Sequence, residues 1–120
     1  MRILVADDNG LVRRGIAALL ASDDECEVCG EASNASETLQ KAGELLPDMV
    51  LLDVSMPGAS GLDTARRLRQ QFPEIKVLIM SQHDPNRMLS HSLEAGADGF
   101  VDKSRMGTDL LRVLRDMFKA

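Results

Sequence analysis

The chain has 120 residues, of which 44% are hydrophobic and 28% charged, as in folded globular proteins, and residues 1–120 fit one domain. Its formal net charge of −5 disfavours a surface that itself binds nucleic acid, because affinity for the phosphate backbone requires clustered Lys and Arg. No segment resembles a secretory signal or has the roughly 18 consecutive apolar residues of a membrane span, so we expect a cytoplasmic protein with no membrane partner.

Short apolar runs alternate with longer stretches of helical periodicity along the whole chain. The runs predict five strands, at Arg2–Ala6, Glu27–Glu31, Met49–Leu52, Lys76–Met80 and Gly99–Val101. The apolar stripes between them predict helices within residues 12–19, 35–46, 62–72, 85–95 and 110–117. Such alternation predicts an α/β fold with a parallel sheet. We take the arrangement of that sheet from a known fold, the flavodoxin-like (βα)5 doubly wound sheet with strand order 2-1-3-4-5.

Two cysteines, Cys26 and Cys29, form a C-x-x-C pattern near the second predicted strand. In a strand, a spacing of three residues puts the two side chains on opposite faces. With only this pair and two histidines in the chain, a zinc or redox site is disfavoured. We therefore predict reduced, structural thiols.

Two helical stretches carry features beyond a simple amphipathic pattern. Arg66, Arg67 and Arg69 cluster within residues 62–72, and we interpret them as a solvated outer face. The stretch 85–95 has few apolar residues, so we expect the least firmly packed helix there and a candidate moving part.

The last predicted helix has more apolar residues than one buried stripe needs. They are Leu110, Leu111, Val113, Leu114, Met117 and Phe118. Part of this surface is predicted to meet a partner chain, as in a homodimer, or an output domain; packing in the core is the alternative.

Polar residues suited to phosphate chemistry stand at the ends of four predicted strands. Asp7 and Asp8 follow the first strand, Asp53 the third and Ser81 the fourth, and Lys103 comes just after the fifth. The carboxyl ends of parallel strands meet at one edge of a sheet, so these groups are predicted to share one pocket. Three clustered carboxylates repel one another unless a cation intervenes, and a hard dication such as Mg²⁺ suits this donor set.

Each of these groups has a candidate role in that pocket. Asp53 is the candidate nucleophile, because carboxylates form aspartyl-phosphates. The Lys103 ammonium can neutralise a phosphoryl group, and the Ser81 hydroxyl can donate a hydrogen bond to one of its oxygens.

The chain resembles the receiver domains of bacterial two-component response regulators. The resemblance rests on Asp7 and Asp8, on LLDVSMPG at 51–58, on Ser81 and on AGADGFVDK at 95–103. LVRRGIAALLAS at 11–22, EVCGEASNASETL at 27–39 and PDMVLLDVSMPGASGL at 47–62 look like receivers of the NarL/FixJ (LuxR-type) group. Members of that group usually precede a helix-turn-helix domain. The resemblance therefore implies control of transcription through an output domain that these residues do not contain.

The resemblance also implies a role for each matching residue. Asp53 would accept a phosphoryl group from a phosphohistidine of a sensor histidine kinase. Asp8 would ligate Mg²⁺ directly and Asp7 through water, with the backbone carbonyl of Ser55 as a further ligand. Lys103 would pair with the phosphoryl group, and Ser81 and Phe100 would be the switch hydroxyl and the switch aromatic residue.

Three alternatives remain open at this point. A phosphohydrolase of the haloacid dehalogenase type also uses an aspartate nucleophile, but it needs a second Asp where this chain has Ser55. An FMN-binding module would share the topology, but Asp7 and Asp8 would repel the phosphate of the ligand. A stand-alone receiver or phosphorelay intermediate would have no DNA output. For a receiver we expect no enzymatic turnover beyond self-phosphorylation and slow autodephosphorylation.

Overall fold

The computed structural model describes residues 1–56, 61–81 and 94–118. Its strands are β1 (Arg2–Ala6), β2 (Glu27–Ala32), β3 (Met49–Asp53), β4 (Lys76–Ser81) and β5 (Gly99–Asp102). Its helices are α1 (Gly10–Ala21), α2 (Ala35–Leu45), α3 (Gly61–Gln71), the 3₁₀ turn η1 (Lys103–Arg105) and α5 (Met106–Met117). The predicted mobile helix at 85–95 lies, except for its last two residues, outside the described residues.

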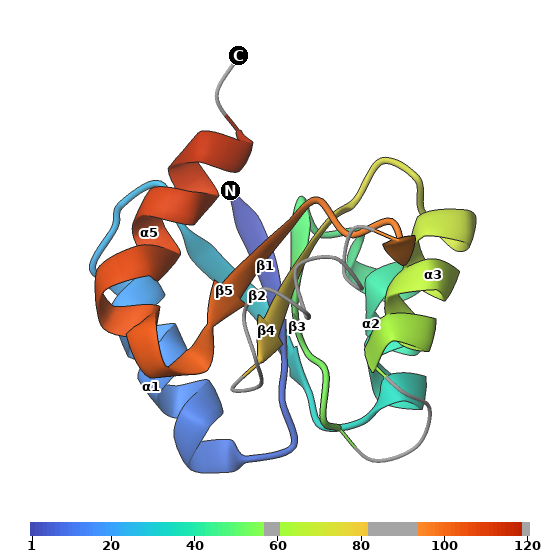
Figure 1. Ribbon diagram of the computed structural model, residues 1–120, viewed down its shortest axis with the longest axis horizontal. Coiled ribbons are helices and arrows are strands. Elements are labelled where there is room, and N and C mark those ends of the chain that lie inside the picture. The colour runs from blue at the N-terminus through green and yellow to red at the C-terminus, as the bar shows by residue number, and fades with distance from the viewer. Residues whose placement is uncertain (57–60, 82–93, 119–120) are drawn as a thin grey trace.

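The five strands form one parallel sheet in the order β2-β1-β3-β4-β5, which confirms the predicted topology. Helices α1 and α5 cover one face of the sheet, and α2 and α3 cover the other (Figure 1). The predicted strands begin at the correct residues, but four of them extend one residue further. Asp53 and Ser81 are therefore the last residues of β3 and β4, so the strands themselves fix their backbones.

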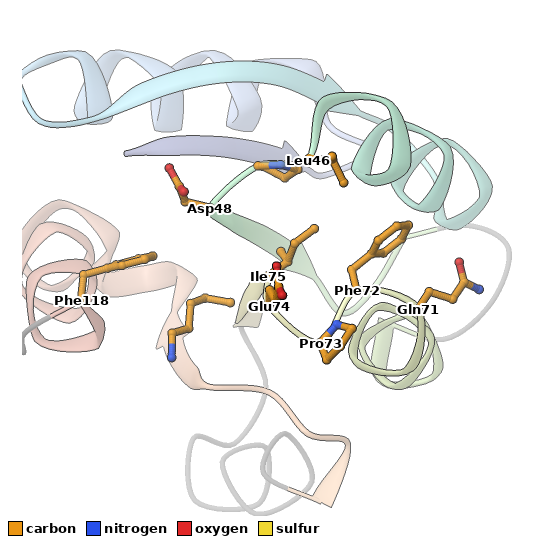
Figure 2. Close-up of a pocket in the computed structure, with 10 residues that line it drawn as sticks. Leu46, Asp48, Gln71, Phe72, Pro73, Glu74, Ile75 and Phe118 are labelled. Carbon is orange, nitrogen blue, oxygen red and sulfur yellow. The ribbon is translucent and has the colours of Figure 1, made fainter.

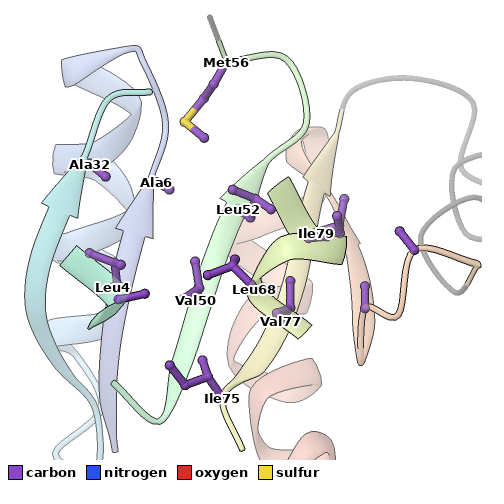
Figure 3. Close-up of a cluster of buried hydrophobic side chains, with 14 residues drawn as sticks. Leu4, Ala6, Ala32, Val50, Leu52, Met56, Leu68, Ile75, Val77 and Ile79 are labelled. Atoms are coloured by element: carbon purple, nitrogen blue, oxygen red, sulfur yellow. The ribbon is translucent and has the colours of Figure 1, made fainter. Parts of the chain in front are cut away.

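The core has two parts, one on each face of the sheet, and both consist mainly of aliphatic and methionine side chains. On the α2/α3 side, Leu4, Val50, Leu52, Val77 and Ile79 pack against Leu68 of α3 (Figure 3). On the α1/α5 side, alternate strand residues pack against Ile16, Leu20, Leu110 and Leu114. Strands covered on both faces explain the nearly unbroken apolar runs in the sequence. None of the helices in the described ranges combines the length and apolarity that crossing a bilayer requires.

Leu46 corrects the predicted stripe of the second helix. We expected it in the buried stripe of residues 35–46, but it is 63% exposed and has a left-handed backbone, with φ of 47°. Pro47 follows it, and a residue before proline is disfavoured in the right-handed helical conformation. The helix therefore ends at Leu45, and that residue packs against the core in its place.

The two cysteines are free thiols, as predicted. Cys26 lies just before β2 and packs against the α1/α5 side of the core. Cys29 lies within β2 at the point where its register with β1 shifts between Val28 and Gly30. Burial raises the pKa of both thiols above the ordinary value, which keeps them protonated and weakly nucleophilic.

The last helix packs most of its apolar residues into the core. Leu110 and Leu114 are buried, and Leu111, Val113 and Met117 pack partly buried against the same cluster. Phe118, at 37% exposure, is the exposed large residue of this set. Core packing, the alternative stated for this surface, therefore accounts for all but one of the six residues.

Arg69 corrects the interpretation of the arginine cluster as a solvated face. Arg66 and Arg67 are exposed, but the Arg69 guanidinium donates hydrogen bonds to the carbonyls of Gly96, at 3.0 Å, and Pro73, at 2.8 Å. It also forms an ion pair with Asp98, whose carboxylate accepts the Val77 N–H at 2.8 Å. Arg69 thus ties the end of α3 to the turn before β5, where Gly96 has a left-handed backbone, with φ of 87°.

We expect Arg69→Met to lower the free energy of unfolding by about 2 kcal/mol, because the variant loses hydrogen bonds from a charged donor in a half-buried position. Arg67→Met removes the same charge from an exposed side chain of the same helix and should change stability by less than about 0.5 kcal/mol. Urea denaturation of both variants measures the difference. Equal effects would show that Arg69 contributes only its charge.

Candidate functional site

The carboxyl ends of β1 and β3 bring three carboxylates together, as the sequence predicted. Ligand oxygens of Asp7, Asp8 and Asp53 all lie within 4.8 Å of one another. Asp7 and Asp53 are buried, whereas Asp8 is exposed. The corner is therefore anionic and open to solvent on the Asp8 side.

Lys103 joins this group from the start of η1, directly after β5. Its Nζ lies 2.7 Å from Asp7 Oδ2 and 3.1 Å from Asp53 Oδ2, and its side chain is 13% exposed. Burial alone would lower the pKa of Lys103, but the hydrogen bonds and negative charges of Asp7 and Asp53 outweigh it and raise the pKa above its ordinary value. The ammonium is therefore charged at neutral pH and is shared between two carboxylates.

The remaining charge in this corner fits a bound cation. Asp7 Oδ2 and Asp53 Oδ2 are buried, and apart from Lys103 no hydrogen-bond partner for either oxygen lies among the described residues. One ammonium facing three carboxylates leaves a formal charge of −2. Three clustered carboxylates, with solvent reaching them from the Asp8 side, form a donor set that suits a hard dication such as Mg²⁺.

The other oxygen of Asp53 is held by Ser55. Asp53 Oδ1 accepts hydrogen bonds from the Ser55 N–H at 3.2 Å and from the Ser55 hydroxyl at 3.0 Å. Gly61, the first residue of α3, presses on the same loop. Its N–H donates to the Val54 carbonyl at 3.2 Å, and a Cβ at this position would lie 2.3 Å from Val54 Cα. Only glycine fits there, so the first turn of α3 supports the loop that follows Asp53.

Residues that the sequence did not single out fix Asp7 and its peptide bonds. The Asp7 N–H donates to the Ala32 carbonyl at 3.0 Å, and Asp7 Oδ1 accepts the Asn9 N–H at 2.9 Å. The Asn9 side chain caps α1, which starts immediately afterwards. Arg13 reaches back from the first turn of α1 and donates to the Asp7 carbonyl at 2.6 Å. The signal for both residues was their position after the paired aspartates: Asn9 follows Asp8 directly, and Arg13 comes five residues after Asp8.

Ser81 and Phe100 lie in β4 and β5, the last two strands before Lys103. Ser81 is buried, and in the β4/β5 register it stands opposite Asp102, the residue before Lys103. Phe100 stands opposite Ile79 and is half-buried against the α2/α3 side of the core. The structure therefore brings Ser81 next to the end of β5, which Lys103 follows. Phe100 lies two residues before that end.

A hollow of about 500 Å³ lies elsewhere, at the amino ends of β3 and β4 (Figure 2). Leu46, Phe72, Ile75 and Phe118 line it, together with Asp48 and neighbouring residues. None of the acidic residues of the corner contributes to it. Ligands of open α/β sheets bind outside the carboxyl ends of the strands, so the acidic corner is the stronger candidate for function.

Comparisons with known proteins show which family the whole chain resembles. The family model described as the response regulator receiver domain matches residues 3–115. The response regulator GacA of Pseudomonas viridiflava is 40% identical over 118 residues, covering 98% of this chain and 55% of GacA. The oxygen regulatory protein NreC of Staphylococcus haemolyticus is 37% identical over 120 residues, covering 99% of this chain and 55% of NreC.

A solved structure extends the likeness to three dimensions. A two-component response regulator of the LuxR family from an Aurantimonas species has a TM-score of 0.91 and 31% identity to this chain. The match covers 97% of this chain and 83% of that one. The chain spans about half the length of the curated relatives it matches.

Proposed function

Since this chain belongs to the response regulator receiver family, in its LuxR-type group, we propose that Asp53 is its phosphoacceptor and that a sensor histidine kinase is the donor. One observation carries the proposal: the Asp53 carboxylate ends a strand between Ser55 on one oxygen and Lys103 on the other. A carboxylate held in this way presents an oriented oxygen within an anionic corner whose donor set suits a cation.

In the proposed phosphoryl transfer, one bond to phosphorus forms and one breaks. A carboxylate oxygen of Asp53 attacks phosphorus, and the bond from phosphorus to the histidine nitrogen of the kinase breaks. The electron pair of that bond returns to the imidazole nitrogen, which is then protonated. Lys103 stays in contact with the incoming phosphoryl oxygens and balances their charge. Asp8, Asp53 and the carbonyl of Ser55 would hold Mg²⁺, with Asp7 through water, and the bound ion would draw charge off the transferring oxygens.

The added charge then provides a basis for switching. A phosphoryl group brings about −1.5 to −2 charge at neutral pH, which favours approach of the Ser81 hydroxyl and the Lys103 ammonium. Ser81 ends β4 and Phe100 lies in the adjacent β5, so a shift of Ser81 can be passed to the face made by β5 and α5. Reversing a 99:1 population requires about 5.5 kcal/mol of preference for the active state.

The output is proposed to be transcription, through a DNA-binding domain of the kind found in LuxR-type regulators. Homodimer formation and a cytoplasmic location belong to the same proposal. A stand-alone receiver or phosphorelay intermediate would use the same acceptor chemistry without that output. A phosphohydrolase is not supported: Ser55, in the place of the required second acid, donates its hydrogen bonds to Asp53.

Acetyl phosphate with MgCl₂ tests the acceptor directly. We expect the native chain to gain the mass of one phosphoryl group, stable in acid and labile in base, and to gain none in EDTA. Asp53→Asn should show no adduct, because the amide is not nucleophilic, and a matched change of the exposed Asp24 to Asn should leave the adduct unchanged. Intact-mass spectrometry gives the result. An adduct on Asp53→Asn would place the acceptor elsewhere.

A further inference from the structure

The acidic corner includes Asp8, whose carboxylate differs from those of Asp7 and Asp53 in its polar contacts. Its carboxylate is exposed and makes no hydrogen bond or ion pair with any described residue. The direction in which Asp8 points is therefore set by its backbone, and above all by the peptide bond that joins it to Asp7. Whatever orients that peptide orients the most accessible carboxylate of the corner.

Arg13 is the side chain that holds this peptide. Its Nη1 donates to the Asp7 carbonyl at 2.6 Å, and its Nε donates to Glu31 Oε1 of β2 at 3.0 Å. The side chain is 22% exposed, so it is largely enclosed between α1 and the sheet edge. Helical side chains lean toward the amino end of the helix, which explains why a residue in the first turn of α1 reaches back to the end of β1.

We propose that Arg13 is a positioning residue for the metal site: through the Asp7 carbonyl it orients the Asp7–Asp8 peptide and so presents the Asp8 carboxylate to a dication. Glu31 in turn holds Arg13 by its ion pair, while the backbone carbonyl of Glu31 accepts a hydrogen bond from Lys41. A support therefore runs from β2 through Arg13 to Asp8. The inference rests on the proposed function only in taking Mg²⁺ as the dication.

Removing Arg13 should change the affinity for a dication in opposite directions, depending on whether Arg13 acts through orientation or through its charge. The proposal can therefore be tested. Losing a positive charge beside an anionic corner should by itself tighten the binding of a dication. Losing an oriented ligand should weaken it, and removing groups that orient metal ligands typically costs about 10- to 100-fold in affinity. Arg14 is the matched control, because it is the next residue of α1, is exposed and makes no hydrogen bond or ion pair with the described residues.

The experiment titrates ¹⁵N-labelled native chain, Arg13→Met, Arg14→Met and Arg13→Lys with MgCl₂ at constant ionic strength. The dissociation constant is read from the amide shifts of Asp8 and its neighbours. We expect about a tenfold higher constant for Arg13→Met. Arg14→Met should stay within about twofold of native, because its exposed charge is screened. Arg13→Lys should recover most of the loss, since an ammonium can still donate to the Asp7 carbonyl.

A second readout separates positioning from general damage to the fold. The rate of phosphorylation by acetyl phosphate in Arg13→Met should return close to the native rate when Mg²⁺ is raised to saturation. Equal constants for Arg13→Met and Arg14→Met, or a rate defect that persists at saturating metal, would overturn the proposal. Failure of the acceptor assignment looks different, because the native chain itself would then bind no Mg²⁺ near Asp8 or gain no adduct.

Discussion

Lys103→Met is expected to destabilise the metal-free protein by about 3 kcal/mol, because it leaves two buried carboxylates facing each other without their shared counter-charge. Adding Mg²⁺ should recover much of this loss, since a ligand that binds only the folded state stabilises it. Phosphorylation by acetyl phosphate should slow by about 10²-fold, the cost of removing one charged group that stabilises a transition state. Urea denaturation in EDTA and in MgCl₂, with intact-mass time courses, measures both effects.

Two further variants serve as controls for Lys103→Met. Lys76→Met removes a lysine that makes no ion pair with the described residues and stands at the opposite edge of the sheet, so it should be close to neutral. Lys103→Met leaves two carboxylates without their counter-charge, and the double variant Asp7→Asn/Lys103→Met removes one of them. The double variant should therefore be more stable than Lys103→Met alone. If Lys103→Met were as stable as native in EDTA, the bridge between Asp7 and Asp53 would contribute nothing to folding.

The Lys103 bridge also predicts how stability depends on pH. The pKa of Lys103 is raised in the folded protein by its hydrogen bonds to Asp7 and Asp53, which outweigh the opposing effect of burial. A raised pKa means that the contribution of Lys103 is fully present below the unfolded value of about 10.4 and is lost as pH rises through the folded value. The gap in unfolding free energy between native and Lys103→Met should therefore narrow above about pH 10.4.

Asp8→Asn is expected to stabilise the metal-free protein but to weaken its binding of Mg²⁺. Without metal, removing one of three clustered carboxylates should raise the free energy of unfolding by about 1 kcal/mol, the repulsion in water-like surroundings between the exposed Asp8 and carboxylates a few ångströms away. With metal, affinity for Mg²⁺ should fall by at least about tenfold, because the accessible ligand is gone. Thermal unfolding in EDTA and a Mg²⁺ titration followed by NMR measure the two effects.

Asp24→Asn is the control for this variant, since it removes an exposed carboxylate in the loop between α1 and β2, away from the corner. It should change neither Mg²⁺ affinity nor the response of stability to Mg²⁺. Unchanged Mg²⁺ affinity in Asp8→Asn would remove Asp8 from the ligand set and would also remove the basis for the role of Arg13.

The fold could be predicted from the sequence because its main signals are local or periodic. Apolar runs gave the strands to within one residue, and the alternation of strand and helix gave a parallel sheet. The strand order was taken from a known doubly wound fold, and the structure has the same order. Leu46 was assigned wrongly because periodicity continued past the end of α2, where Pro47 disfavours the helical backbone. The register shift at Cys29 has no signal in a pattern of alternating residues.

The site residues that could be predicted are those at the ends of strands. The residues that could not be predicted act through contacts with residues distant in the sequence. Asp7, Asp8, Asp53 and Lys103 meet because parallel strands share an edge. Arg13 and Arg69 were not found, because their partners Glu31 and Asp98 lie 18 and 29 residues away. An arginine on a helix looks solvated in a sequence, and only the path of its side chain shows which loop it holds.

The close approach of Gly61 to Val54 has a consequence for transplanting this acceptor loop into another protein. Residue 61 lacks room for any side chain, so the start of α3 and the loop after β3 must be moved as one piece. A chimera that grafts residues 53–56 onto a host with alanine or serine at the equivalent of 61 should misplace the acceptor carboxylate even though every grafted residue is correct. The smallest portable unit therefore ends inside a helix, not at the loop boundary where a graft is usually cut.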